Sequence, residues 1–552
     1  MRASRGSRSG WLVTVAGVLA AATVGSIDPA PARSQAEPGA VALERATDAG
    51  PGDEPADAAP ADDEGEAGDD SAEPATPQGD LPADPAERLR WLQGELREQL
   101  ADRPSLRSAR VGIEVVDVAT GERLWSHDPD GRYNLASNTK VITAAAALAS
   151  LGPDYRWRTS VLAMPAAFSQ RTGVVDGDLY VRGRGDPTLE GDDLAGLARD
   201  LRVLGVRKVT GGLILDRSYF DGADVPPHFD EQPRERAGFR ASVGALSVSR
   251  NAAVIVVEPD PTGAGAARVR LVPDAPEAVR LVRAEVITVS RGRTHVRIVS
   301  AAKRDHVEVS VTGQLNVDDG IYYGRQRVDD PAAMAMEVLR RALVDEGIRI
   351  GRRGFQVAPT PVGARALAEH DSAELAVVLR TMNKHSDNFY AETVLKTLGA
   401  EARGAPEATW ADGVAAVRAY LTGCGVDLAG LRIDNGSGLF SSTEVSPAQL
   451  VATLRCAARD FRVAPELMSS LAVAGIDGTM RRRLRGDATV GRVRAKTGTL
   501  ATVTTLTGYA GVDGGRLAAF AVLVNDAGSA TRRDARSLQD AIAATLVAYA
   551  AP

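Results

Sequence analysis

The apolar and polar positions of the chain follow two periods, and the first folded segment combines both. Residues 86–99 carry apolar side chains at helical spacing. Residues 110–118 form a nearly continuous apolar run that predicts a strand, residues 119–122 predict a turn, and residues 123–125 begin a second strand. The pattern therefore predicts a helix followed by two neighbouring strands.

A second helix is predicted at residues 140–151. This segment is rich in alanine and apolar on nearly every side, and Gly152 and Pro153 end it. A helix that is apolar all round belongs in the centre of a domain. We therefore expect this helix to form the core of the fold.

The C-terminal part predicts the rest of the same architecture. Residues 503–510 and 517–524 are strand-like runs joined by a glycine-rich turn at residues 511–515. Residues 531–549 have apolar positions at helical spacing. The sequence thus predicts an α+β fold, an antiparallel sheet with helices on its faces, built from both ends of the chain.

The middle of the chain, residues 158–354, has a different sequence pattern, in which turn residues separate short β-rich runs. These runs are residues 177–182, 212–215, 253–257, 269–272, 285–289, 295–299 and 306–311. Two helical patterns interrupt them, at residues 192–204 and 332–346. The pattern predicts one or two mainly β modules inserted between the two parts of a single domain, residues 85–157 and 355–552.

The N-terminal segment predicts export. Three arginines precede an apolar run at residues 11–24, and an Ala-Pro-Ala sequence follows, so residues 1–36 resemble a secretory signal peptide. The alternative, a membrane anchor, needs about twenty apolar residues, and this run is shorter. Either interpretation leaves the remainder of the chain outside the cytoplasm.

Residues 37–84 form an acidic linker with 15 acidic residues and one basic residue. The linker contains too few large apolar residues to offset its ordering entropy, so we predict that it is disordered. Its charge of −14 accounts for the net charge of −7, and the chain from residue 85 onward carries about +4. No basic stripe predicts nucleic-acid binding.

Cysteines and histidines give no sign of a metal site or cofactor. The two cysteines, Cys424 and Cys456, lack the spacing of a zinc or C-x-x-C redox motif. An exported chain permits a disulfide between them, and buried free thiols remain the alternative. The six histidines form no close metal-binding pairs.

Three short motifs carry the candidate chemistry. They are an S-x-x-K at Ser137–Lys140, an S-x-N at Ser386–Asn388 and a K-T-G at Lys496–Gly498, followed by Thr499. On a helix, residues i and i+3 share a face, so Lys140 can take the proton of Ser137. A serine hydroxyl is a poor nucleophile until a neighbouring base does so. In this order, the motifs are the signature of penicillin-recognising serine acyl enzymes.

Two local alternatives are disfavoured. A second S-x-N at residues 249–251 lies in the β-rich middle of the chain, and no K-T-G follows it at a matching distance. His385 adjoins Ser386, but a sequence-adjacent histidine seldom faces the same way as its neighbour, and the chain has no G-x-S-x-G elbow.

The motifs and the text around them resemble the class C low-molecular-mass penicillin-binding proteins, the D-alanyl-D-alanine carboxypeptidase/endopeptidase family. That family places a large insertion between its first two motifs, and here Ser137 and Ser386 are far apart. The similar stretches include residues 183–189, 243–248, 382–392, 434–439, 473–484 and 491–500. The resemblance implies the penicillin-binding/β-lactamase-like transpeptidase fold. For Asp434 and Ser437 it gives no role, and a simple turn is the alternative.

The resemblance also implies roles for the motif residues. Ser137 is the nucleophile, Lys140 the general base and Ser386 a relay for the proton to the leaving amine. The substrate-binding residues are Asn388, Lys496, Thr497, Gly498 and Thr499. Lys496 is expected to lower the pKa of Lys140, and the backbone N–H groups of Ser137 and Thr499 to form the oxyanion hole.

The predicted function is an exported serine D,D-carboxypeptidase/D,D-endopeptidase that acts on peptidoglycan stem peptides and is acylated by β-lactam antibiotics. The alternatives are a β-lactamase, a D-amino-acid esterase or amidase, and a non-enzymatic peptidoglycan-binding module. We expect the insertion to orient crosslinked strands and to supply no catalytic group. The balance of the two peptidase activities, the third stem residue and the oligomeric state stay open.

Overall fold

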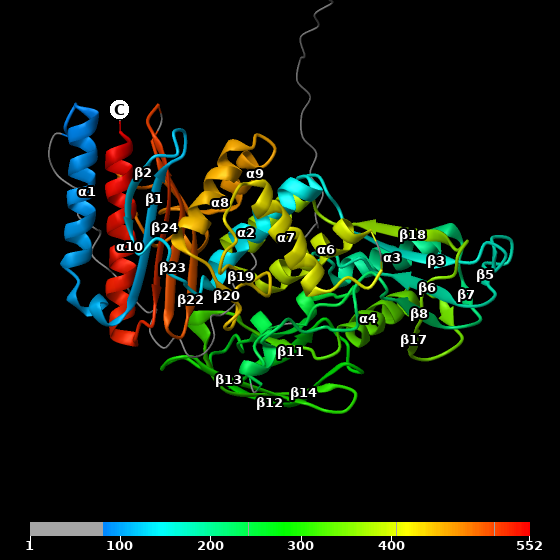
Figure 1. The fold of residues 1–552 in the computed structure, drawn as a ribbon. Helices are drawn as coiled ribbons and strands as arrows, with labels where there is room; N and C mark the ends of the chain where they lie inside the picture. Colours follow the sequence, from blue (N-terminus) through cyan, green and yellow to red (C-terminus); the bar gives the residue numbers. More distant parts are fainter. Residues whose placement is uncertain (1–80, 234, 241, 405, 513, 552) are drawn as a thin grey trace, which may run out of the picture. The chain divides into compact units, whose positions relative to one another are not determined.

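The computed structural model describes residues 81–551 except residues 234, 241, 405 and 513 (Figure 1). The predicted signal peptide and most of the predicted linker lie outside the described residues. Asp84, the last residue of that linker, caps helix α1 (Pro85–Ala101) by accepting a hydrogen bond from the Glu87 N–H at 2.9 Å. Among the described residues, no helix is long and apolar enough to cross a membrane.

A six-stranded antiparallel sheet combines both ends of the chain, in the order β2-β1-β24-β23-β22-β21. The strands are β1 (Arg110–Asp117), β2 (Arg123–His127), β21 (Ala472–Val473), β22 (Val493–Leu500), β23 (Val503–Gly511) and β24 (Leu517–Asn525). The predicted antiparallel sheet and its C-terminal hairpin are confirmed. The K-T-G motif lies within a further strand, β22, which the sequence pattern did not predict.

Helices cover both faces of this sheet (Figure 1). Helices α1 and α10 (Ser529–Ala550) share a core with the sheet that includes Leu92, Phe520 and Ile542. On the other face lie α2 (Thr139–Leu151), α5 (Leu375–Lys384), α6 (Asn388–Arg403), α7 (Trp410–Gly423), α8 (Pro447–Arg459) and α9 (Ala464–Ser470). As predicted, α2 is buried on every side at its centre. A small ladder of β19 (Arg432–Ile433) and β20 (Thr443–Glu444) lies between α7 and α8 in the chain.

The inserted segment leaves α2 and builds its own sheets and core. One sheet has the order β17-β8-β6-β3-β18, and its strands are β3 (Arg158–Ala163), β6 (Leu179–Arg182), β8 (Leu213–Asp216), β17 (Phe355–Val357) and β18 (Arg365–Asp371). A smaller sheet holds β4 (Phe168–Ser169), β5 (Val174–Val175), β7 (Lys208–Val209) and β16 (Arg349–Ile350). The helices α3 (Gly191–Leu204) and α4 (Pro331–Asp345) pack against each other and match the predicted pair.

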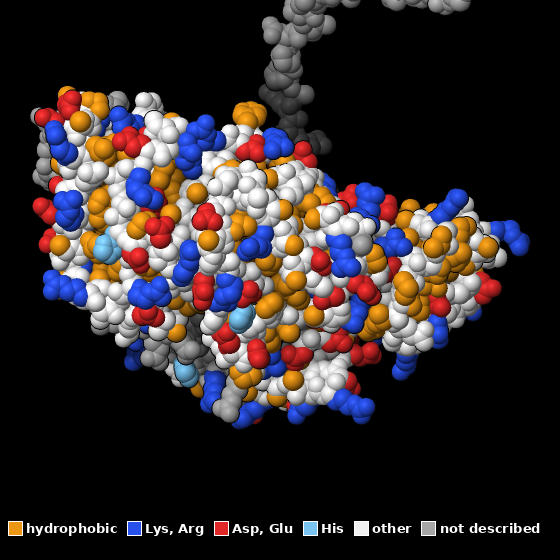
Figure 2. Space-filling view, viewed as in Figure 1, with side chains coloured by type: hydrophobic (Ala, Val, Ile, Leu, Met, Phe, Trp, Pro, Cys, Tyr) orange, Lys and Arg blue, Asp and Glu red, His pale blue; other side chains and the backbone are white. Residues whose placement is uncertain are grey.

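Two further sheets carry the long β-rich run of the insertion. One is β10-β12-β14-β13 and the other β11-β9-β15. Their strands are β9 (Ala252–Glu258), β10 (Gly265–Ala266), β11 (Arg268–Val272), β12 (Val279–Val289), β13 (His295–Ala302), β14 (Val307–Asn316) and β15 (Tyr322–Arg327). Figure 2 shows that acidic and basic side chains are interspersed over the face of the molecule that is also seen in Figure 1.

The two ends of the insertion lie side by side. Strands β3 and β18 are antiparallel with Arg158 opposite Asp371, and the backbone N–H of Trp157 donates to the Ser372 hydroxyl at 2.9 Å. Because β17 and β18 both join a sheet of the insertion, we propose that the insertion ends at Asp371 rather than at residue 354.

The question of the cysteines is settled by a disulfide. Cys424 caps the C-terminus of α7, Cys456 lies in α8, and the two are bonded with their Cα atoms 5.7 Å apart. The bond ties together two helices on the same side of the sheet.

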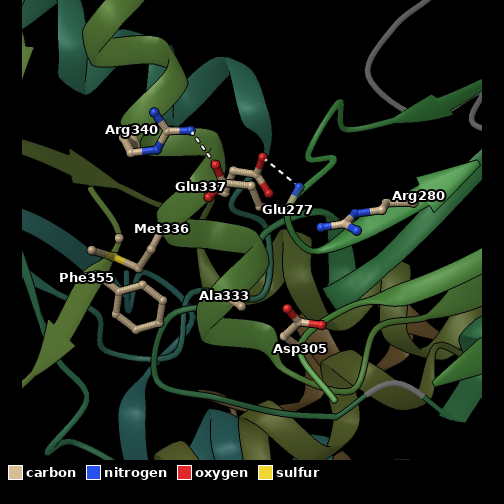
Figure 3. Close-up of a pocket in the computed structure, with 9 residues that line it drawn as sticks. Glu277, Arg280, Asp305, Ala333, Met336, Glu337, Arg340 and Phe355 are labelled. Carbon is tan, nitrogen blue, oxygen red and sulfur yellow. Dashed lines mark hydrogen bonds and ion pairs between the residues drawn. The ribbon is translucent and has the colours of Figure 1, made fainter. Parts of the chain in front are cut away.

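A cavity of about 450 Å³ lies within the insertion (Figure 3). Its charged groups already have partners in the protein. The Glu337 carboxylate accepts from the backbone N–H groups of Glu277 and Ala278, and Arg340 lies 3.5 Å from Glu277. None of the motif residues lines it, so the chemistry must be sought elsewhere.

Candidate active site

Ser137 lies on a tight turn that leads directly into the buried helix α2. The turn is a single 3-10 segment, η2 (Ala136–Asn138), and Ala136 has a left-handed backbone with φ of 47°. Such strain in a non-glycine residue persists only where the surrounding structure holds it. Here Asn138 donates to the Thr505 hydroxyl on β23, and that hydroxyl donates to the Leu135 carbonyl at 2.9 Å. The half-buried Ser137 is thereby fixed against the sheet.

Lys140 is fully buried at the start of α2, one turn after Ser137, and three groups surround its amine. Lys140 Nζ lies 2.9 Å from Ser137 Oγ, 2.6 Å from Asn388 Oδ1 and 3.1 Å from the carbonyl oxygen of Ser437. A neutral amine has two N–H bonds and one lone pair. The two oxygens that can only accept take the N–H bonds, so the lone pair is left for the Ser137 hydroxyl.

Burial sets the protonation of both lysines in the site. It lowers the pKa of Lys140 to about 7, against the opposing charges of Glu392 and Asp387. Burial also lowers the pKa of Lys496 well below its usual range, and repulsion from Lys140 adds to this. The expectation that Lys496 is what lowers the pKa of Lys140 is therefore corrected, because burial is the main cause.

Ser386 bridges the second and third motifs. It lies in the turn between α5 and α6 with a left-handed φ of 60°. Lys496 Nζ donates to Ser386 Oγ at 2.9 Å and to the Thr497 carbonyl at 2.8 Å. Asp387 caps α6 by accepting from the Tyr390 N–H at 3.0 Å. His385, which caps the end of α5, is exposed.

Strand β22 passes close to the turn that carries Ser137 because residue 498 is glycine. A Cβ at this position would collide with the Thr505 hydroxyl and lie 2.9 Å from the Leu135 carbonyl oxygen. Thr497 is hydrogen-bonded to the Thr479 hydroxyl at 2.8 Å, and Thr499 is exposed.

The outer edge of β22 is available beside these residues. Strand β21 pairs only with Arg494 and Ala495, so within the described chain no strand pairs with this edge from Lys496 onward. An unpaired strand edge can bind an extended peptide through its main chain.

Two residues of the site received no role from the sequence. The Ser437 carbonyl contacts Lys140, and the buried Glu392 carboxylate accepts from the Gly436 and Ser437 N–H groups at 2.9 Å each. Glu392 lies one turn after Asn388 on α6, and this spacing was the available signal. The Asp434 carboxylate instead accepts from Arg432 and lies 2.9 Å from His228 Nε2.

The insertion contains none of the motif residues, but it contacts one of them. Asn388 Nδ2 donates to the Phe239 carbonyl at 3.0 Å, and Phe239 lies in η4 (Gly238–Arg240) of the insertion. This bond leaves Asn388 Oδ1 facing Lys140.

The second S-x-N sequence, η5 (Ser249–Asn251), has a supporting role. Ser249 donates to Glu190 at 2.6 Å, and the Arg250 guanidinium lies 3.5 Å from Asp387. It therefore buttresses the S-x-N at Ser386 and does not compete with it.

The arrangement places one serine hydroxyl beside a buried amine and holds a second hydroxyl with another amine, next to a strand edge that is unpaired among the described residues. Among the described residues, no group of histidine, cysteine and carboxylate side chains is placed to hold a metal ion. These parts suit acyl transfer through a covalent serine intermediate.

Comparisons with known proteins agree with this chemistry. The model of the D-Ala-D-Ala carboxypeptidase 3 (S13) family matches residues 92–546. A D-alanyl-D-alanine carboxypeptidase of Actinomadura sp. (strain R39) is 36% identical over 475 residues, 84% of this chain and 86% of the relative. The D-alanyl-D-alanine carboxypeptidase DacB of Haemophilus influenzae is 26% identical over 395 residues, 71% of this chain and 80% of the relative.

A solved structure shows the same fold. The crystal structure of penicillin binding protein 4 (dacB) from Haemophilus influenzae superposes with a TM-score of 0.67 at 23% identity, covering 81% of this chain and 97% of that chain. A second structure of that protein, in complex with a β-lactam, superposes with a TM-score of 0.63 at 23% identity, covering 81% of this chain and 98% of that chain.

Proposed function

Because the chain belongs to the D-Ala-D-Ala carboxypeptidase 3 (S13) family, the class C low-molecular-mass penicillin-binding proteins, we propose that Ser137 is the nucleophile of a peptidoglycan D,D-peptidase. The enzyme is a serine-type D-alanyl-D-alanine carboxypeptidase that also cleaves D,D-crosslinks and is acylated by β-lactams. The observation that carries the proposal is the set of three contacts around Lys140, which aims its lone pair at Ser137.

Acylation begins with proton transfer. Lys140 takes the proton of Ser137, and the freed oxygen attacks the carbonyl carbon of the penultimate D-alanine. The backbone N–H groups of Ser137 and Thr499 stabilise the resulting oxyanion, a contribution of roughly 3–4 kcal/mol per donor. As the C–N bond breaks, the proton passes through Ser386 to the leaving amine, which departs as D-alanine or as the crosslinked strand. Water then releases the acyl group from Ser137, and Lys140 is the base for that step too.

Substrate recognition follows from β22. The stem peptide pairs along the free edge of the strand, and Asn388 binds its amide. Thr497 and Thr499 hold the terminal carboxylate, with the charge that Lys140 and Lys496 share nearby. Gly498 is required for the close approach of the strand to the nucleophile.

A β-lactamase is the strongest alternative, because it shares the acylation chemistry but needs a carboxylate that activates a deacylating water. The nearest candidate is Glu392, and both of its oxygens are engaged by the N–H groups of Gly436, Ser437 and Trp410. This occupancy favours the slow deacylation of a penicillin-binding protein. An esterase or amidase uses the same acyl chemistry but has no need of so large an insertion, and intact reactive contacts disfavour a non-enzymatic module.

We place the enzyme outside the cytoplasm, where its substrate lies. The disulfide between Cys424 and Cys456 and the apolar run at residues 11–24 support this location. N-terminal sequencing of the protein recovered from the cell envelope tests it, and an uncleaved chain found only in the cytosol contradicts it.

The decisive experiment uses defined muropeptide monomers and crosslinked dimers, with product analysis by mass spectrometry. We expect free D-alanine from pentapeptide monomers and monomers from dimers, and neither product with Ser137→Ala. In parallel, benzylpenicillin should add its full mass to the peptide that contains Ser137, because the ring opens without losing an atom. An adduct on Ser386, or turnover by Ser137→Ala, contradicts the assignment.

A further inference from the structure

One face of helix α6 carries three polar residues at successive turns. Asn388, Glu392 and Lys396 are spaced four apart, so their side chains point the same way. Asn388 contacts Lys140, as described above. The other two are buried charges, with Glu392 3% exposed and Lys396 fully buried. Ionised groups are rarely buried unless other groups of the protein pair with them.

Lys396 is held by the insertion. Its Nζ donates to Asp221 Oδ1 at 2.6 Å and to the Ala223 carbonyl at 2.9 Å. The same ammonium group lies 4.1 Å from the ring centroid of Trp410 and 4.9 Å from that of Phe220. Burial lowers the pKa of Lys396, while the nearby carboxylates and the two aromatic faces favour its charged form.

Trp410 links the two charges of α6. Its indole N–H donates to Glu392 Oε2 at 2.8 Å, and its ring lies against the Lys396 ammonium. Glu392 in turn holds the Ser437 N–H, and the carbonyl of the same residue contacts Lys140. A continuous series of contacts thus runs from the half-buried Asp221 in the insertion to the Lys140 amine.

We propose that Glu392 and Lys396 are positioning residues that set the pH at which Lys140 becomes the base. Glu392 favours the charged form of Lys140, and Lys396 offsets part of that effect. The proposal rests on the function proposed for Lys140. It gives the insertion a part in the chemistry, because Asp221 holds Lys396 in place.

The other groups around the two lysines are accounted for. Those that face Lys140 are Ser137 from the turn before α2, Asp387, Asn388 and Glu392 from α6, the Ser437 carbonyl, and Lys496 from β22. Asp387 is already engaged by Arg250 and the Tyr390 N–H. Those that act on Lys396 are Asp221 and Asp224 from the insertion and Glu392 from its own helix.

The direction of each effect follows from charge. Glu392 opposes the effect of burial on the pKa of Lys140, so removing its charge lowers that pKa further. Removing the charge of Lys396 leaves Glu392 less compensated, so the pKa of Lys140 rises. A buried unit charge one to two helical turns away, at an effective dielectric constant of about 20, shifts a pKa by about one unit.

The test is the pH profile of acylation. The rate of acylation by benzylpenicillin is measured between about pH 5 and 9 for the wild type, Glu392→Gln and Lys396→Met, with circular dichroism and the final adduct stoichiometry as checks on folding. The acid limb is the fall in the acylation rate at low pH. We expect its midpoint to lie about one pH unit lower in Glu392→Gln and about half a unit or more higher in Lys396→Met. Glu401→Gln, an exposed carboxylate farther along α6, is the matched control and should leave the limb in place.

The outcomes distinguish the role inferred for Glu392 and Lys396 from the function proposed for Ser137 and Lys140. If both variants lower the maximal rate but leave the acid limb unmoved, the residues are merely structural and this inference is wrong. If Glu392→Gln does not fold, Lys396→Met alone tests the inference, because only the loss of a positive charge moves the acid limb to higher pH. A wild-type profile without an acid limb, or an adduct away from Ser137, overturns the proposed function and this inference with it.

Discussion

At the scale of single residues, two buried lysines each contact one serine of the motifs. Lys140 contacts Ser137 and Lys496 contacts Ser386, and both amines are buried completely. Repulsion between the two buried amines adds to the effect of burial, so the pair does not readily hold two charges. We infer that the pair holds at most one charge at neutral pH, and that Lys140 is the base when its amine is neutral.

The first prediction concerns the identity of the base. Lys140→Arg keeps the charge, but a guanidinium is not deprotonated in proteins, so acylation should fall by at least about 10²-fold. Mass spectrometry of the penicillin adduct over time measures the rate. Lys208→Arg, on the exposed surface of the insertion, is the control and should react as the wild type. Near-normal acylation of Lys140→Arg means that another group takes the proton.

The second prediction concerns the pH dependence of the wild type. Only the neutral amine accepts the proton of Ser137, and the pKa of Lys140 is about 7. The neutral fraction falls tenfold for each pH unit below the pKa, so acylation should decline with that slope below about pH 7 and level off above it. Stopped-flow rates with benzylpenicillin check this. A rate that stays constant between pH 5 and 8 contradicts it.

At the scale of secondary-structure elements, the site depends on how closely strand β22 approaches the turn before α2. The absence of a side chain at Gly498 allows that approach, as the collision with the Thr505 hydroxyl shows. The third prediction is that Gly498→Ala displaces the strand from the nucleophile and slows acylation by about 10²-fold, the effect of a misplacement of about 1 Å. Gly94→Ala in α1, where a Cβ meets no atom within 4 Å, should not slow it. An unchanged rate for Gly498→Ala contradicts the role of the close approach.

The disulfide gives the fourth prediction. It closes a loop of 32 residues between α7 and α8, and loop-closure entropy in the unfolded chain corresponds to about 3–4 kcal/mol. Replacing both Cys424 and Cys456 with alanine should lower the free energy of unfolding by about that amount. The Lys140 contacts lie elsewhere, so the acylation rate at 25 °C should change little. Thermal and urea unfolding of the two proteins measure the difference, and equal stability contradicts the expectation.

The elements differ in how well the sequence predicts them, and the reasons are physical. The position of helix α2 is predictable because a helix that is apolar on every side is stable only in the core. Strand β22 is not, because its centre, Lys496 to Gly498, has no alternating apolar pattern and owes its conformation to pairing with β23. The contacts of Glu392 could not be predicted either, because they are made with the Ser437 loop, which lies 45 residues away in the chain.

At the scale of the whole chain, the insertion is anchored to the site at more than its two ends. Its ends meet where β3 pairs with β18, which is the condition for a tolerated insertion. Yet the Phe239 carbonyl binds Asn388, and Asp221 binds Lys396 on the same helix. From these contacts we infer that the insertion positions residues of α6, although it contains none of the motif residues.

Arg240 follows Phe239 in the chain and lies in the same short turn, η4. Its guanidinium is buried against the rings of Phe229 and Phe440, at 4.3 Å and 4.9 Å from their centroids, and donates to the carbonyls of Phe229 and Gln232. Burial lowers its pKa to about 10, so it remains charged at neutral pH. Phe440 belongs to the loop that follows Ser437, so one side chain joins the insertion to the loop that contacts Lys140.

The last prediction follows from this anchor. Arg240→Met keeps the length of the side chain but removes its hydrogen bonds, so the Phe239 carbonyl should shift from Asn388 and acylation should fall by about tenfold or more, roughly 1.4 kcal/mol of barrier. Arg283→Met, on an exposed strand of the same insertion, is the control and should acylate normally. Replacing residues 158–371 with a short Gly/Ser linker should remove both anchors and cost more than Arg240→Met alone. A folded truncation that acylates within tenfold of the wild type would show that neither anchor matters and that Asn388 is held by its own helix.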